Sequence, residues 1–251
     1  MTTPTQTVAI VQARMGSTRL PGKTLADVGG QSLLRLVLLR LMAARTLDTI
    51  VVATTAADED DAIETEVSKL GLPCVRGHSW DVLARFRQAA HEYPGHLFVR
   101  VCADNPFVDP RQVDSLVRFE RDGGYDLAYN HRPECGLPDG VGAEVVTDAV
   151  LDRLDTVAVA QDHREHVTLY AYDHPDEFRL GALVSANVAG AGYRLDVDYP
   201  EDLEFVRALY AALPGRNAPL WSTRTLVRTL DKHPDLPSLR RQRIVATATL
   251  A

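Results

Sequence analysis

Short apolar runs alternate with amphipathic stretches along the first half of the chain. Continuous apolar and β-branched residues predict buried strands at 8–11, 49–54, 74–76 and 96–101. Apolar positions at helical spacing, with Ser32 near an N-cap and Pro110 in a first turn, predict helices over 32–45, 58–70, 80–92 and 110–121. This alternation is typical of an α/β fold with a doubly wound, mostly parallel sheet.

The pattern changes after Tyr125. It predicts strands at 126–129, 144–146 and 178–184, helices at 148–154 and 162–170, and a turn-rich stretch over 130–142. A polar connector, a helix near 222–231 and a loose end beyond Arg241 follow. We expect one domain over 1–214, in which 126–185 forms a small α+β insertion, and a C-terminal helical tail over 215–251.

Length, charge and hydrophobic composition exclude some classes of protein. The 251 residues suit one large α/β domain, and the net charge of −7 argues against a nucleic-acid partner. We expect no membrane partner and no secretory signal, because no apolar run is long enough to span a bilayer and no basic stretch precedes an apolar one at the N-terminus. The three separate cysteines fit reduced thiols in a cytoplasmic protein, with Cys74 and Cys102 as buried structural thiols.

A loop rich in cations follows the first predicted strand directly. It contains Arg14, Arg19 and Lys23 together with Gly16 and Ser17. The carboxyl ends of parallel strands are where open α/β sheets bind ligands, and backbone amides beside guanidinium and ammonium groups suit a polyphosphate. The glycine spacing fits neither a Walker loop nor a dinucleotide fingerprint. A solvated basic turn is the alternative.

Carboxylates follow two later segments. Asp104 comes after the fourth strand, and Asp196 and Asp198 share one side of a stretch that reads as extended. Because Mg²⁺ binds through one or two carboxylates plus phosphate oxygens, these three are candidate metal ligands. A turn-forming role is the alternative for Asp104, and Glu201 and Asp202 are explained as partners of a helix dipole.

The loop and five further blocks resemble the sugar cytidylyltransferases, which activate acylneuraminate and 3-deoxy-octulosonate, and in particular their spore coat polysaccharide biosynthesis protein F-like branch. The loop 14–23 reads Arg-Met-Gly-Ser-Thr-Arg-Leu-Pro-Gly-Lys. The other blocks are Arg-Gly-His-Ser-Trp-Asp-Val-Leu-Ala-Arg-Phe at 76–86, Arg-Val-Cys-Ala-Asp-Asn-Pro at 100–106, Pro-Asp-Gly-Val-Gly-Ala-Glu-Val at 138–145, Arg-Glu-His-Val-Thr-Leu-Tyr at 164–170 and Asp-Tyr-Pro-Glu-Asp-Leu at 198–203. His78, Cys102 and Asn105 depart from the family pattern.

This resemblance implies a nucleotide-diphospho-sugar transferase-like fold and a Mg²⁺-dependent transfer of CMP from CTP to a hydroxyl of an acidic, sugar-like acceptor, with release of pyrophosphate. It also implies a homodimer, with 126–185 closing the acceptor side of the site. The catalytic residues would be Arg14, Lys23, Asp104 and Asp198, with Mg²⁺ on Asp104, Asp198 and Asp196. The nucleotide would be bound by Ala13, Arg14, Gly16, Ser17, Arg19, Lys23, Arg76, Asp81 and Arg85.

Two other functions stay open at this point. Asp196 and Asp198 form an Asp-x-Asp pair of the kind a glycosyltransferase uses to bind a nucleotide sugar, and a nucleotide-binding protein without catalysis would keep the same cations. The 164–170 block leaves roles open as well. His166 fits either a general base or a structural hydrogen-bonding residue, and Arg164 and Glu165 fit an ion pair that shapes the sugar pocket.

Overall fold

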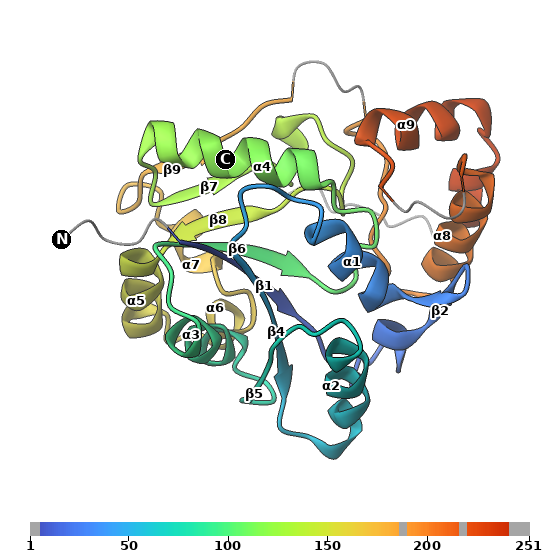
Figure 1. Ribbon diagram of the computed structural model, residues 1–251. Helices are drawn as coiled ribbons and strands as arrows, with labels where there is room; N and C mark the ends of the chain where they lie inside the picture. The colour runs from blue at the N-terminus through green and yellow to red at the C-terminus, as the bar shows by residue number, and fades with distance from the viewer. Residues whose placement is uncertain (1–5, 186–189, 216–219, 241–251) are drawn as a thin grey trace.

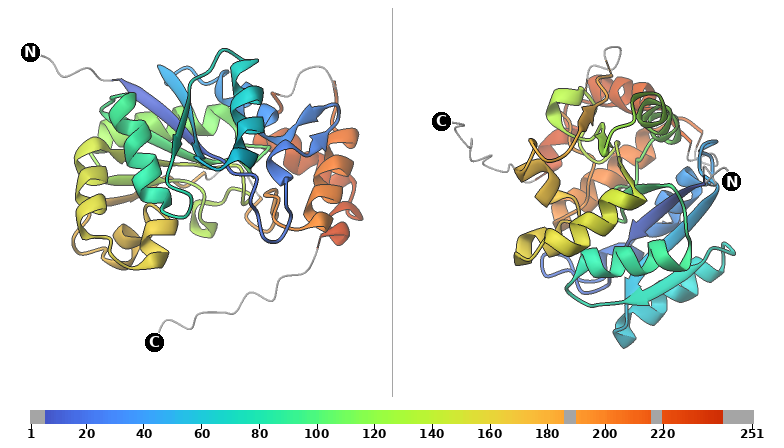
Figure 2. Two further views of the ribbon diagram at one scale, coloured as in Figure 1. Left: turned by 90° about the horizontal axis from the view of Figure 1, so that it is seen from below. Right: turned by 90° about the vertical axis from the view of Figure 1, so that its left-hand side faces the viewer.

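The structure of the protein, a computed structural model, describes residues 6–185, 190–215 and 220–240. Within these residues, seven strands form one sheet in the order β5-β4-β1-β6-β8-β7-β9, with helices on both sides (Figures 1 and 2). The strands are β1 (Thr7–Gln12), β4 (Thr49–Thr55), β5 (Cys74–Gly77), β6 (Leu97–Cys102), β7 (Leu127–Tyr129), β8 (Glu144–Thr147) and β9 (Leu180–Ala182). The short strands β2 (Asp27–Val28) and β3 (Gln31–Ser32) form a separate two-stranded antiparallel sheet.

The first strand lies in the middle of the sheet. β1 pairs in parallel with β4 on one side and with β6 on the other, and β4 pairs in parallel with β5. The chain therefore builds outward through β4 and β5 and then returns to the opposite side of β1, which makes the β1–β6 boundary the topological switch point. β8 runs antiparallel to both β6 and β7, and β9 is parallel to β7. The predicted doubly wound, mostly parallel sheet is confirmed.

Nine helices of at least one turn cover the sheet or flank it within the described residues. They are α1 (Leu33–Leu41), α2 (Asp61–Ser68), α3 (Val82–Glu92), α4 (Pro110–Gly123), α5 (Asp148–Val157), α6 (Gln161–Glu165), α7 (Leu169–Asp173), α8 (Pro200–Ala212) and α9 (Thr223–Lys232). As expected, Ser32 caps α1 by accepting from the backbone N–H of Arg35, and Pro110 opens α4. In that part of the chain, no helix is long and apolar enough to cross a membrane.

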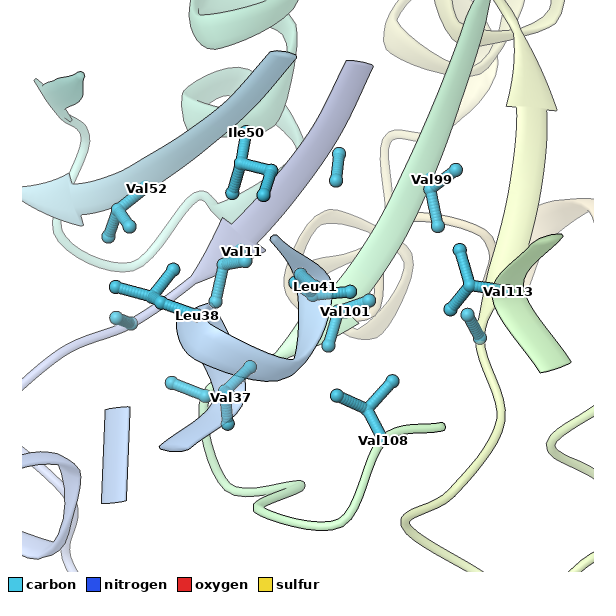
Figure 3. Packing of buried hydrophobic residues seen from close by; sticks show 14 of the residues in the cluster. Val11, Val37, Leu38, Leu41, Ile50, Val52, Val99, Val101, Val108 and Val113 are labelled. Atoms are coloured by element: carbon cyan, nitrogen blue, oxygen red, sulfur yellow. The ribbon is translucent and has the colours of Figure 1, made fainter. Parts of the chain in front are cut away.

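Alternate side chains of β1 divide the core into two layers. Val11 faces α1, α2 and α4, whereas Ile10 faces α3, α5 and α7. Figure 3 shows Val37, Leu38 and Leu41 of α1 beside Val11 in the first layer. A third apolar cluster joins α8 and α9 to the far side of α1, so the helix of the tail packs onto the domain beside α8 (Figure 1).

Several predicted elements differ from the structure. The helix expected over 162–170 is wrong: α6 ends at Glu165, and α7 begins only at Leu169. Val167 lies between them with a positive φ of 35°, a conformation that a β-branched residue rarely adopts. The break lets Val167 enter the second core layer, while the Thr168 hydroxyl donates to the carboxylate of Glu144.

Other boundaries change less. The helix expected over 32–45 ends at Leu41, the one expected over 58–70 consists of a 3₁₀ turn (Asp58–Asp60) followed by α2, and the strand expected over 178–184 shortens to β9. The loose end expected beyond Arg241 lies outside the described residues.

The cysteine prediction was wrong in part. Cys135 is buried, while Cys74 and Cys102 are only half-buried, although all three are free thiols. Burial nevertheless raises the pKa of the Cys74 thiol to about 11 and that of Cys102 to about 12. Both thiols are therefore protonated and weakly nucleophilic near neutral pH.

Candidate active site

A cavity of about 350 Å³ opens at the carboxyl ends of β1 and β6, at the switch point of the sheet. Its walls come from the loop after β1, the first turns of α3, the end of β6, the turn after α6 and the segment before α8. Segments far apart in the sequence thus meet at one sheet edge. Of the residues predicted for the site, those lining the cavity are Ala13, Arg14, Ser17, Arg19, Lys23, Arg85, Asp104 and Asp198.

Lys23 lies between the two predicted carboxylates. Its Nζ is 2.9 Å from Oδ2 of Asp104 and 3.1 Å from Oδ1 of Asp198, and it donates to the carbonyl oxygen of Val197 at 2.6 Å. Nη2 of Arg19 approaches the same Oδ1 of Asp198 at 2.7 Å. Burial alone would lower the pKa of Lys23, but the adjacent Asp104 and Asp198 carboxylates outweigh it, so the pKa is raised. Lys23 is therefore a fixed positive charge.

Local contacts hold the cationic loop in place. Gly22 takes a φ of 73° just before the 3₁₀ turn Lys23–Leu25, and the hydroxyl of Thr24 donates to the carbonyl oxygen of Arg14 at 2.6 Å. The fully buried Asp60 accepts from the backbone N–H of Met15 at 2.7 Å and from the Thr55 backbone at 3.0 Å. Sequence reasoning missed Asp60, because it sits within an acidic run that fits the start of a helix.

Asp104 and Asp198 make a donor set suited to a hard divalent cation. Burial raises the pKa of the Asp104 carboxyl, the Lys23 ammonium opposes that rise, and the negative charge of Asp198 adds to it. Two carboxylates that share one ammonium at a solvent-accessible cavity match the protein contribution to a Mg²⁺ site, which is completed by phosphate oxygens and water. Among the described residues, no group of three or more His, Cys, Asp or Glu side chains forms a site that could hold a metal by itself.

The carboxylate of Asp196 does not join the other two. It contacts Nη2 of Arg194 at 2.5 Å and Nη2 of Arg240 at 3.2 Å, whereas Asp198 faces Arg19 and Lys23. The Asp-x-Asp pair is thus divided between two sets of cations. Asp196 therefore faces other cations than Asp198 does, and the metal role predicted for it stays a prediction.

Three other predicted nucleotide-binding residues lie outside the cavity lining. Arg76 pairs with the exposed carboxylates of Asp61 and Glu64. Asp81 caps α3 through the backbone N–H of Ala84. Gly16 is a place of close approach, because a Cβ there would lie 2.7 Å from a carboxylate oxygen of Glu59. The nucleotide contacts predicted for these three residues stay predictions.

Arg85 is the deepest cation of the cavity. Only 2% of the residue is exposed, and its Nη1 donates to the carbonyl oxygen of His78 at 2.5 Å. Within the described residues, its buried Nε has no hydrogen-bond partner. Burial, together with the nearby charge of Arg14, lowers the pKa of Arg85 to about 10. A mostly buried guanidinium at a cavity wall places a positive charge there that solvent screens little.

The turn after α6 closes the cavity opposite the cationic loop. Arg164 and Glu165 do not pair with each other as expected. Arg164 instead contacts Asp81 at 2.8 Å, and Glu165 reaches Arg14 across the cavity at 3.9 Å. His166 lines the cavity where α6 ends. The 164–166 segment therefore places one anion and one imidazole at the cavity, with the anion next to the cationic loop.

The fold and this arrangement of charges define an enzyme that transfers a nucleotidyl group. A family model described as cytidylyltransferase matches residues 8–224, and the chain belongs to this family. The spore coat polysaccharide biosynthesis protein SpsF of Bacillus subtilis (strain 168) is 35% identical over 237 residues, which cover 92% of this chain and 96% of that protein. The predicted family and its spore coat branch are confirmed.

Two further comparisons agree. The 3-deoxy-manno-octulosonate cytidylyltransferase of Anaeromyxobacter sp. (strain Fw109-5) is 31% identical over 238 residues, covering 82% of this chain and 97% of that protein. A solved cytidylyltransferase from Leptospira borgpetersenii serovar Hardjo-bovis (strain JB197) superposes with a TM-score of 0.87 at 27% identity, covering 95% of this chain and 99% of that one. The chain therefore shares nearly the whole length of its relatives.

Proposed function

We propose that this protein transfers CMP from CTP to a hydroxyl of an acidic sugar of the nonulosonic or ulosonic type, or of a similar anionic acceptor, and releases pyrophosphate in a Mg²⁺-dependent reaction. The observation that carries the proposal is the position of Lys23 between Asp104 and Asp198, in a loop that brings two further arginines to the same cavity. The relative named for 3-deoxy-manno-octulosonate supports the class of acceptor.

In this reaction the hydroxyl oxygen of the acceptor forms a bond to the α-phosphorus and loses its proton to water, while the bond from phosphorus to the bridging oxygen breaks and pyrophosphate leaves with the electron pair. Arg14, Arg19 and Lys23 would bind the β- and γ-phosphates and offset the charge that develops on the leaving group. Such positioning and charge neutralisation can carry most of the rate of a phosphoryl or nucleotidyl transfer. The guanidinium and ammonium groups at the cavity wall would supply both.

Asp104 and Asp198 would hold the Mg²⁺ ion. When bound, this ion would supply positive charge beside the phosphate and acceptor oxygens. Arg85 would contribute positive charge to the wall of the nucleotide site. The acceptor would lie beside Cys102, Glu165 and His166, which also line the cavity.

The remaining expectations stay predictions. These are the homodimer, the part that 126–185 plays in it, the division into a domain over 1–214 and a tail over 215–251, and the cytoplasmic location. Oligomeric state is open to measurement by light scattering on the purified protein.

The first experiment is a thermal-shift screen of the four nucleoside triphosphates, each with and without Mg²⁺. Ligands that bind the native state raise the melting temperature. We expect a CTP-selective shift that Mg²⁺ strengthens, followed by pyrophosphate release when ulosonic and nonulosonic acids are added. Stabilisation by nucleotide sugars alone, or hydrolysis of CMP- or UDP-sugars, would instead indicate a glycosyltransferase.

The variant Asp198→Asn tests the assignment of the metal site. It keeps the size of the side chain and removes the charge, so turnover falls far more than stability. Asp122→Asn, an exposed position of α4, is the matched control. Near-normal Mg²⁺-dependent turnover of Asp198→Asn would show that the metal assignment is wrong.

A further inference from the structure

Arg240 contacts the segment before α8 at several points. Its Nη1 donates to the carbonyl oxygen of Arg194, and its Nη2 donates to the carbonyl oxygen of Asp196 at 3.0 Å. The same Nη2 pairs with Oδ1 of Asp196 at 3.2 Å and with Oδ1 of Asp202 at 2.9 Å. Only 8% of the Arg240 side chain is exposed. One guanidinium near the end of the described chain thus holds two backbone carbonyls and two carboxylates.

Packing of the tail brings Arg240 to this place. The 3₁₀ turn Leu236–Leu239 precedes it, and Leu236 is buried in the same apolar cluster as α8. The Arg240 guanidinium lies over the ring of Phe205 in α8, with its carbon 5.3 Å from the ring centroid. The position of the cation is therefore set by apolar contacts with the helix that follows the site.

Asp202 connects Arg240 to the candidate active site. Its side chain is 2% exposed, and its ion pair with Arg240 uses Oδ1. The other oxygen, Oδ2, accepts from the backbone N–H of Asp198 at 2.9 Å and of Tyr199 at 3.0 Å. A buried carboxylate that loses its cation is costly, so the Asp202 side chain would tend to reorient toward other donors or toward water. This reorientation would loosen the two amides.

We propose that Arg240 is a positioning residue for nucleotidyl transfer, which fixes the backbone of Asp198 through Asp202 and through the carbonyl oxygens of Arg194 and Asp196. This inference rests on the role proposed for Asp198. Arg240 lies beyond residues 8–224, the part of the chain that the family model matches. Its pairing with Asp196 also keeps the charge of that carboxylate neutralised beside Asp198.

The test compares Arg240→Ala, Arg240→Lys and the control Arg228→Ala, which removes an exposed arginine of α9. Hydrogen–deuterium exchange of peptides covering 195–203 is followed in the full chain without nucleotide. In Arg240→Ala, exchange there should rise about tenfold, the change expected when one hydrogen bond is weakened. Exchange in β1 and β6 should stay as in the unchanged protein.

Steady-state kinetics form the second readout. The loss of a residue that orients a ligating carboxylate typically lowers activity or metal affinity about 10- to 100-fold. We expect Arg240→Ala to lower kcat by such a factor and to raise the Mg²⁺ concentration needed for half-maximal rate, with a much smaller change in the KM for CTP. Arg240→Lys should recover part of the loss, because it keeps the charge but not the planar fork of donors.

A double-mutant cycle of Arg240→Ala with Asp202→Asn tests whether Arg240 acts on Asp198 through Asp202. If Arg240 acts through Asp202, the effects of the two substitutions on exchange at 195–203 are smaller together than their sum. Arg240→Ala behaving like Arg228→Ala in both readouts would overturn the proposal. So would faster exchange spread evenly over the sheet, since that marks general destabilisation. If the unchanged protein turns over no CTP with any acceptor, the proposed function fails, while the exchange comparison still decides whether Arg240 holds Asp198.

Discussion

Replacing Lys23 with Met removes the cation that Asp104 and Asp198 share. The distances of 2.9 and 3.1 Å to Nζ place the two carboxylate oxygens at most about 6 Å apart. Two unit charges at that separation repel each other by about 3 kcal/mol at an effective dielectric constant near 20. Arg19 still contacts Asp198 and offsets part of this repulsion. We therefore expect Lys23→Met to lower the free energy of unfolding by about 2–3 kcal/mol in the absence of divalent ions.

Urea unfolding with and without Mg²⁺ measures this effect. Because a divalent cation would replace the missing charge, Mg²⁺ should stabilise Lys23→Met more than the unchanged protein. The value of kcat/KM for CTP should nevertheless stay about 100-fold lower, since a lost donor to developing phosphate charge is not restored. Lys69→Met is the control, because Lys69 is 60% exposed and forms a surface pair worth little. Unfolding free energies for Lys23→Met that match the unchanged protein, with and without Mg²⁺, would refute this electrostatic account.

Two further substitutions test the support of the site. Burial alone would raise the pKa of Glu144, but the charge of Arg100 outweighs it and lowers the pKa to about 2. The ionised carboxylate therefore contributes its full stabilisation at pH values above the pKa of Glu144 in the unfolded chain. This contribution is lost as the pH falls toward 2. Glu144→Gln should therefore lower the free energy of unfolding by about 3 kcal/mol at pH 7. The difference in melting temperature between this variant and the unchanged protein should shrink below about pH 4. A difference that stays constant with pH would contradict this linkage. Gly140→Ala should destabilise the protein more than Gly30→Ala. Both glycines have a positive φ, but only a Cβ at 140 would lie 2.6 Å from the backbone nitrogen of Asp196. Equal urea midpoints for the two variants would show that this clash does not destabilise the fold.

Local sequence patterns predicted most of the sheet and the cations of the cavity. The continuous apolar runs of β1, β4 and β6 need no tertiary information, and the loop after β1 lies at the ligand-binding edge because parallel strands share their carboxyl ends. The direction of β8, by contrast, could not be predicted from the local sequence. Glu144-Val145-Val146 reads as a strand in either orientation, and only its pairing with β6 makes it antiparallel.

Long-range contacts explain what the sequence could not supply. Asp196 and Asp198 are equivalent by alternation, but Arg240 pairs with the first and Lys23 with the second. The helix expected over 162–170 breaks at Val167 because burial of this side chain outweighs the local preference for a helix. Each of these outcomes depends on a partner at least 20 positions away in the chain or on the packing of a whole layer.

The central place of β1 bears on the order in which the molecule can assemble during synthesis. Of the described strands, β1 comes first in the chain and has its two sheet neighbours in β4 and β6, so one of its edges stays open until the chain through Cys102 has been made. Unpaired apolar strands are templates for aggregation, and N-terminal parts fold first during translation. The ammonium of Lys23 receives its second carboxylate only when Asp198 arrives. A nascent chain that ends before Asp198 therefore lacks part of the cavity lining and one of the two carboxylates proposed to hold Mg²⁺.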